Sequence, residues 1–224
     1  MIEIPSFNEL IEKSIISNWD KDALTDFKGA TLQYHDVARK IEKLHIMFES
    51  SGVQRGDKIA LCGRNSSNWA VAFLATLTYG AVAVPILHEF TADQIHNIVN
   101  HSEAKLLFVG DYVATIIDQT KMPDLEGIIY IPDYSLVVSR TDKLTYAREH
   151  LNAMFGEKYP KFFRKEHVHY YREQSPEELA LINYTSGTTG FSKGVMIPYR
   201  AMWSNYDFAM TAVAKHIKKG DNVI

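Results

Sequence analysis

The chain has 224 residues, of which 46% are hydrophobic and 23% charged, and these proportions are those of a globular protein with a substantial core. A net charge of -3 argues against a general nucleic-acid-binding surface. The single cysteine, Cys62, excludes an internal disulfide, lies in an apolar run where a buried, inert thiol is expected, and fits a reducing compartment, so we expect a cytoplasmic location.

The first quarter of the chain predicts a helix, a β-hairpin and a second helix. Apolar residues recur at helical spacing in residues 7–19, and two short runs at residues 23–27 and 30–34 flank Lys28-Gly29 as hairpin strands do. Gly52 ends the second helix. The apolar positions of that helix are Val37, Ile41, Leu44 and Phe48.

From residue 58 onward, strands are expected to alternate with helices. The expected strands lie at residues 58–62, 81–86, 106–109 and 128–131. The expected helices lie at residues 69–79, after the capping box that begins at Thr91, and around residues 112–118. Such alternation predicts an α/β fold, with a largely parallel sheet covered by helices on both faces.

One segment imitates a membrane span, because residues 66–88 contain no Asp, Glu, Lys or Arg. Ser66 offers a helix N-cap, Gly80 a helix end, and Pro85 interrupts what remains. We therefore interpret the segment as a buried helix followed by a buried strand.

Residues 133–172 are expected to be less regular than the rest of the chain, and their last part interleaves Lys and Arg with aromatic residues. The favoured interpretation of residues 158–172 is a surface loop anchored by its aromatic side chains. The alternative is a peripheral contact with an anionic membrane at its inner face. His167 and His169 would share one face of a strand, but no ligand cluster accompanies them, so no zinc site is predicted.

Residues 184–194 read Tyr-Thr-Ser-Gly-Thr-Thr-Gly-Phe-Ser-Lys-Gly and follow an apolar run. Glycines allow backbone N–H groups to converge on a ligand, while hydroxyl groups and one ammonium add donors and positive charge. This composition predicts a phosphate-binding loop, with ATP as the natural ligand. A flexible linker is the alternative, but linkers rarely follow a buried strand directly.

The spacing excludes two other loops. A Walker A motif places its lysine directly after the second glycine, whereas Lys193 precedes Gly194. A nucleophile elbow needs a glycine two positions before its serine, and Ser186 lacks one.

The same loop resembles the phosphate-binding signature of the adenylate-forming enzymes, which include acyl-CoA synthetases. Ser192 departs from it, because the family usually has Pro there, and Pro198-Tyr199 stands where many members carry a Ser/Thr-His pair. The resemblance extends over most of residues 31–224, including the Gly56-Asp57-Lys58 run and Val84-Pro85. Among its branches, the long-chain fatty acid–CoA ligases are the most similar.

The resemblance implies a ligase that uses ATP and Mg²⁺ to convert a carboxylic acid, a fatty acid in the most similar branch, to an acyl-adenylate. The acyl group would then pass to coenzyme A. Lys193 and Thr188 would be the catalytic residues, and no metal ligand is assigned. The implied ATP-binding residues are Thr185, Ser186, Gly187, Thr188, Thr189, Gly190 and Lys193.

Family members are longer and carry further motifs after this loop. We therefore interpret the chain as an N-terminal fragment that is inactive alone. Its incomplete sheet would leave an unpaired edge strand and uncovered apolar surface, through which the fragment self-associates. Residues 1–174 would form one α/β subdomain, and residues 175–224 the start of a second. Two alternatives remain: an enzyme that activates aryl or amino acids, and a non-catalytic nucleotide-binding module.

Overall fold

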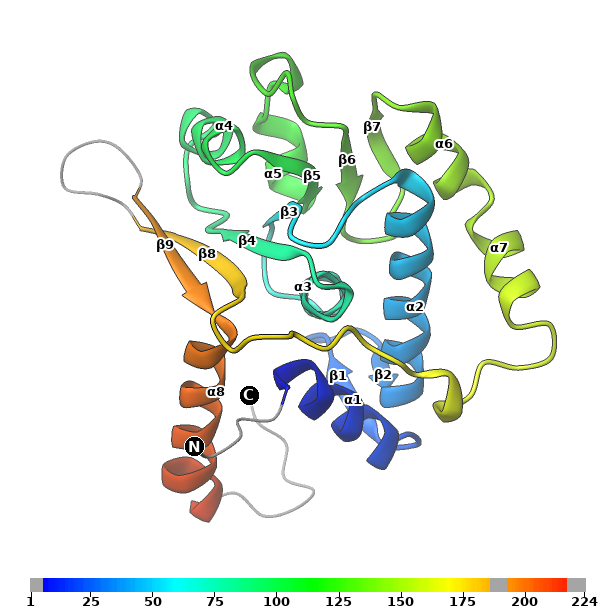
Figure 1. The fold of residues 1–224 in the computed structure, drawn as a ribbon. Coiled ribbons are helices and arrows are strands. Elements are labelled where there is room, and N and C mark those ends of the chain that lie inside the picture. Colours follow the sequence, from blue (N-terminus) through cyan, green and yellow to red (C-terminus); the bar gives the residue numbers. More distant parts are fainter. Residues whose placement is uncertain (1–5, 186–192, 217–224) are drawn as a thin grey trace.

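The structure is a computed structural model that describes residues 6–185 and 193–216. Within these ranges the helices and strands, in chain order, are α1 (Phe7–Ser17), β1 (Asp22–Thr25), β2 (Thr31–Gln33), α2 (Tyr34–Ser51), β3 (Lys58–Cys62), α3 (Ser67–Tyr79), β4 (Val82–Ile86), α4 (Ala92–His101), β5 (Ala104–Val109), α5 (Asp111–Ile116), β6 (Gly127–Tyr130), β7 (Leu136–Ser139), α6 (Asp142–Glu149), α7 (Leu151–Lys158), β8 (Leu179–Thr185), β9 (Lys193–Pro198) and α8 (Tyr199–Phe208) (Figure 1).

A seven-stranded sheet organises the molecule, in the order β7-β6-β5-β3-β4-β8-β9. Its five inner strands run parallel, and the two edge strands, β7 and β9, are antiparallel to their neighbours. A separate antiparallel pair, β1 and β2, confirms the hairpin expected around Lys28-Gly29. The largely parallel α/β fold is therefore confirmed.

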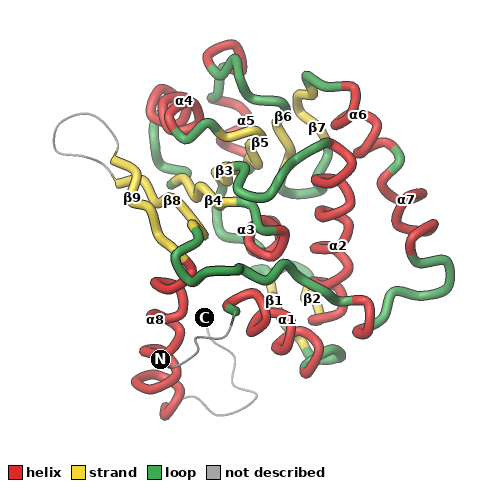
Figure 2. Tube along the Cα trace, in the orientation of Figure 1, coloured by secondary structure: helices red, strands yellow, loops and turns green. Residues whose placement is uncertain are grey.

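Helices cover both faces of this sheet, as its side-chain alternation requires (Figure 2). In β3, Ile59 and Leu61 belong to a core shared with α1, α2 and α3, whereas Ala60 and Cys62 face a second core shared with α4 and α5. Each inner strand is apolar on both sides for this reason. Burial raises the pKa of the Cys62 thiol to about 12, so this cysteine remains a thiol at neutral pH.

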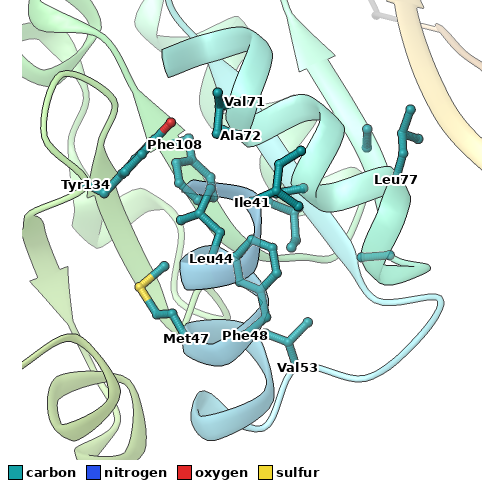
Figure 3. Close-up of a cluster of buried hydrophobic side chains, with 14 of the residues drawn as sticks. Ile41, Leu44, Met47, Phe48, Val53, Val71, Ala72, Leu77, Phe108 and Tyr134 are labelled. Atoms are coloured by element: carbon teal, nitrogen blue, oxygen red, sulfur yellow. The ribbon is translucent and has the colours of Figure 1, made fainter. Parts of the chain in front are cut away.

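The first core has aromatic and aliphatic side chains at its centre (Figure 3). Phe48 of α2 is fully buried, and its ring packs edge-on against the rings of Tyr79 and Phe108, with centroids 5.5 and 6.2 Å apart. Leu44 and Ile41, one and two turns before Phe48, are buried beside it. The helical periodicity read from the sequence thus identified the face of α2 that packs on the sheet.

The apolar segment 66–88 divides as expected. The Ser66 side chain accepts a hydrogen bond from Trp69 N and begins α3, and Gly80 ends it with φ +87°. A side chain at Gly80 would also collide with the Tyr171 ring, whose Cδ1 lies 2.6 Å from an ideal Cβ position. Within the described residues, no helix combines the length and the apolar character that crossing a bilayer requires.

Residues 133–172 are more regular than expected, since they contain β7, α6 and α7. Their low hydropathy conceals this order, because only Leu144, Ala147 and Leu151 of the two helices are buried. The expectation that His167 and His169 share one face of a strand was wrong. His167 ends a short 3₁₀ turn in which its own Nδ1 accepts a hydrogen bond from Arg164 N at 2.9 Å, so the backbone there is not extended.

The aromatic residues of segment 158–172 divide into anchors and one exposed ring. Phe163 and Tyr170 are buried in the first core, whereas Phe162 is 71% exposed. Tyr159 and Phe163 pack edge-on with centroids 4.9 Å apart, and the Tyr159 hydroxyl donates to Glu42 Oε1 at 2.8 Å. These contacts support the interpretation of an anchored surface loop.

The neutral state of His45 links stability to pH. Its Nε2 lies 3.0 Å from Ala75 O and 3.1 Å from Thr78 Oγ1, and burial lowers the pKa of His45 to about 4. The imidazole of the unfolded chain binds a proton near pH 6.5, so the free energy of unfolding that is present above that pH is lost as pH falls toward 4.

We expect His45 to lower the free energy of unfolding of the wild type by up to about 3 kcal/mol between pH 7 and pH 4.5. In His45→Gln this part of the pH dependence should be absent. Urea unfolding at both pH values checks this, and equal pH dependence in variant and wild type would refute it.

Candidate phosphate-binding site

The β8–β9 hairpin positions the two ends of the glycine-rich loop. Thr185 and Lys193 form the last residue pair of this antiparallel ladder, and both side chains are exposed. Ser186, Gly187, Thr188, Thr189, Gly190 and Ser192 lie outside the described residues. Of the predicted site residues, the structure therefore describes Thr185 and Lys193, and it brings these two together.

The hairpin is attached to the sheet through β8. Leu181 pairs with Ala83 of β4, and Ala180 and Ile182 are buried on opposite faces. Across the hairpin, an ideal Cβ at Gly194 would lie 3.0 Å from both Ile182 Cγ2 and Tyr184 Cζ. Glycine at position 194 thus allows the Tyr184 ring to lie against the backbone of β9.

Tyr184 is the first residue of the loop motif, but its side chain packs inside the protein and fixes β8, so we do not count it among the phosphate-binding groups. Its side chain is buried, and its Oη lies 2.7 Å from Nδ1 of His101 at the end of α4. The two rings meet edge to face with centroids 5.8 Å apart. Burial raises the pKa of Tyr184, so the hydroxyl is neutral and available for this hydrogen bond.

Tyr199 begins α8 and is also buried. It stands at the position where many adenylate-forming enzymes have His. Its hydroxyl donates to Leu77 O at 3.0 Å and accepts from Asn8 Nδ2 at 3.2 Å. This tyrosine joins α8 to α1 and α3, and its hydroxyl makes both hydrogen bonds inside the protein.

A hollow of about 460 Å³ lies at the carboxyl ends of the parallel strands. It is lined by residues that directly follow β3, β4, β5 and β6, among them Arg64, His88 and Asp111. Open α/β sheets hold ligands at such edges, where the strand order reverses, and here β4 and β5 lie on opposite sides of β3. Because β8 runs parallel to β4, Thr185 lies at the same sheet edge.

This hollow was not predicted from the sequence, although a glycine directly after β3 and another directly after β5 indicate a close approach of the two turns. An ideal Cβ at Gly63 would lie 2.9 Å from Ile131 Cδ1 and 3.1 Å from Gly110 N, so the two turns touch only because both carry glycine. Asp111 Oδ1 accepts from the Tyr130 hydroxyl at 2.6 Å, which raises the pKa of Tyr130. In the described part of the chain, no group of three or more His, Cys, Asp or Glu side chains is arranged to hold a metal ion.

Comparison with known proteins gives a family and several relatives. The family described as AMP-binding enzyme matches residues 12–224. Long chain acyl-CoA synthetase 3 of Arabidopsis thaliana is 27% identical over 164 residues, which are 73% of this chain and 24% of the relative. The fatty acid–[acyl-carrier-protein] ligase ScoC of Streptomyces coeruleorubidus is 25% identical over 80% of this chain and 30% of its own length.

Among solved structures, the anthranilate CoA ligase AuaEII in complex with anthranoyl-AMP has a TM-score of 0.73 and 18% sequence identity. The likeness covers 95% of this chain and 37% of that one, and at this identity it shows the fold. The chain spans about a third or less of the length of the two curated relatives described above, 24% and 30%.

Proposed function

Since this chain belongs to the family of AMP-binding enzymes, we propose that it supplies the ATP-phosphate-binding part of an AMP-forming ligase that acts on a carboxylic acid. The acid we propose is a fatty acid, and the acceptor coenzyme A. The observation that carries the proposal is the β8–β9 hairpin, which presents Thr185 and Lys193 at the carboxyl edge of the parallel sheet.

The proposed reaction has two steps. A carboxylate oxygen attacks the α-phosphorus of ATP, the bond to the bridging oxygen breaks, and pyrophosphate leaves. The thiolate of coenzyme A then attacks the acyl carbon and displaces AMP. Because the first step moves negative charge onto pyrophosphate, fixed donors and positive charge at that group accelerate it.

The loop residues would divide this task. Backbone N–H groups of Gly187, Thr188, Thr189 and Gly190 would bind the β- and γ-phosphates, with hydroxyl groups of Thr185, Ser186, Thr188 and Thr189 adding hydrogen bonds. Lys193 would neutralise charge on the leaving pyrophosphate. Its place at the loop end of the hairpin, opposite Thr185, supports this role because both chain ends of the loop are then fixed to the sheet.

Mg²⁺ is part of the proposed chemistry because ATP carries it, but we assign it no ligand among the described residues. They contain no suitable cluster of carboxylates and imidazoles. The division of the chain near Gln174 into two subdomains, likewise, stays a proposal. β8, which follows that point, pairs with β4 in the same sheet.

Two alternatives have observations in their favour. The name of the anthranilate CoA ligase indicates an aryl acid, and that of ScoC a carrier protein in place of coenzyme A, so either acid or acceptor could differ here. A non-catalytic nucleotide-binding module is favoured by the departures at Ser192 and Tyr199.

One experiment separates these functions. ATP–pyrophosphate exchange by the full-length protein is measured with a fatty acid, an aryl acid and an amino acid, and the products with coenzyme A are analysed by mass spectrometry. We expect exchange with the fatty acid and a fatty acyl-CoA product. Exchange only with another acid would support the first alternative, and ATP binding without exchange with any acid would support the module.

A further inference from the structure

A second hollow, of about 400 Å³, gathers positive charge away from the glycine-rich loop. It is lined by residues of α2, of the end of α6, of the start of α7 and of the turn after β6. The β8–β9 hairpin lies on the opposite side of the molecule (Figure 1). Four cationic side chains line it: Arg39, Lys40, Lys43 and Arg148. We call it the basic pocket.

Within the described residues, these four cations have no carboxylate at ion-pair distance, although Arg148 interacts electrostatically with Asp133 of the same lining. None of them forms an ion pair within the described ranges, and three of the four side chains are partly buried. Other cations of this protein that pack against the surface do have partners: Lys105 Nζ lies 2.9 Å from Asp57 Oδ2, and Arg172 Nη2 lies 2.6 Å from Glu12 Oε1. Lys40, Lys43 and Arg148 thus differ from these partly buried cations in having no ion pair in the described part of the chain.

Two carboxylates also line the basic pocket, but each is engaged by backbone. Asp36 Oδ2 accepts from Gln33 N at 3.1 Å and so caps α2. Asp133 Oδ1 accepts from Ser135 N at 2.8 Å. These contacts stabilise local turns and leave a net excess of two positive charges in the lining.

Neutral groups hold the cations in place. Lys43 Nζ donates to Asn152 Oδ1 at 2.8 Å and Lys40 Nζ donates to Asn68 Oδ1 at 3.2 Å. Arg148 Nε donates to the backbone carbonyl of Tyr134 at 2.7 Å. Each side chain keeps further N–H donors after these bonds are counted.

The repulsion among these groups is visible at Lys43. Burial lowers the pKa of Lys43, and the charges of Arg39, Lys40 and Arg148 lower it further. Like charges held together in a partly desolvated hollow are unfavourable unless an anion neutralises them.

We propose that the basic pocket binds a small anion bearing one or more phosphate groups. A phosphate matches several converging ammonium and guanidinium donors at once, whereas a single carboxylate would offset one charge. Leu44 and Leu151 add apolar lining, and a volume of about 400 Å³ leaves room for a small soluble ligand. The proposal is independent of the ligase function and of the glycine-rich loop.

Pyrophosphate is the probe for this proposal. Isothermal titration is run with the wild type, Lys43→Gln and the matched control Lys143→Gln, whose exposed lysine on α6 does not line the pocket. All three proteins, the reference included, also carry Lys193→Met, so that binding at the glycine-rich loop is weakened equally in each. We expect Lys43→Gln to weaken binding about tenfold or more, and the control to leave it unchanged. Equal affinity of the two variants, or no binding at millimolar pyrophosphate, would overturn the proposal.

A second measurement does not depend on how Lys43→Gln folds. In the wild type, the pKa of Lys43 is followed by NMR of its side chain, with and without pyrophosphate. Bound anion should raise that pKa, and the exposed variant Arg39→Gln should weaken the effect. An unchanged pKa of Lys43 contradicts the proposal. Lys43-dependent binding to anionic phospholipid vesicles, without any response to pyrophosphate, also contradicts it, because the partner would then be a membrane.

Discussion

Replacing Lys193 by Met is expected to slow ATP–pyrophosphate exchange in the full-length protein by about ten- to a hundredfold, while binding of the acid changes less. The physical reason is the loss of a charge-assisted hydrogen bond to pyrophosphate as it leaves, which contributes about 1.5–3 kcal/mol. Exchange rates at saturating acid, together with acid binding measured by titration, check both parts of this expectation.

Lys161→Met is the matched control, because Lys161 is also exposed but lies in the loop after α7, away from the hairpin. It should leave exchange unchanged. Wild-type exchange rates in Lys193→Met would remove Lys193 from the proposed mechanism. A loss confined to acid binding would place its role on the substrate side.

Replacing Phe48 by Ala is expected to lower the free energy of unfolding by about 3–5 kcal/mol. The ring is fully buried between Tyr79 and Phe108, so its removal leaves a cavity that helix α2 and the sheet cannot close without losing other contacts. Urea unfolding followed by circular dichroism measures the change.

Phe27→Ala removes the same ring from a site that is 91% exposed, and it should change stability by less than about 0.5 kcal/mol. Comparable losses in the two variants would mean that the cluster around Phe48 is not the main core. A loss below about 1 kcal/mol in Phe48→Ala would lead to the same conclusion.

Local signals were sufficient to predict most of the fold. Gly52 and Gly80 end α2 and α3 in the left-handed conformation, with φ of +90° and +87°, where the sequence places a helix end. The capping box at Thr91 is present at the start of α4. Such features depend on a few neighbouring residues, and for that reason a single sequence reveals them.

Features that depend on distant residues could not be predicted in this way. The pairing of β8 with β4, and the burial of Tyr184 against His101, require the complete sheet. The hollow at the carboxyl edge joins turns after four strands, and the basic pocket joins three helices and a turn. No local pattern of charge or spacing distinguishes Lys43 from any other surface lysine before the fold is known.

The topology of β8 has a consequence for the order of assembly. The strands β3, β4, β5 and β6 are joined by short crossovers, whereas β8 reaches β4 only after the chain has passed through β7, α6 and α7. Closing so long a loop is entropically slower than forming neighbouring crossovers. We therefore expect the hairpin to dock late in folding, onto a preformed half-sheet, so that amide protection of β8 in pulsed hydrogen exchange appears after that of β3.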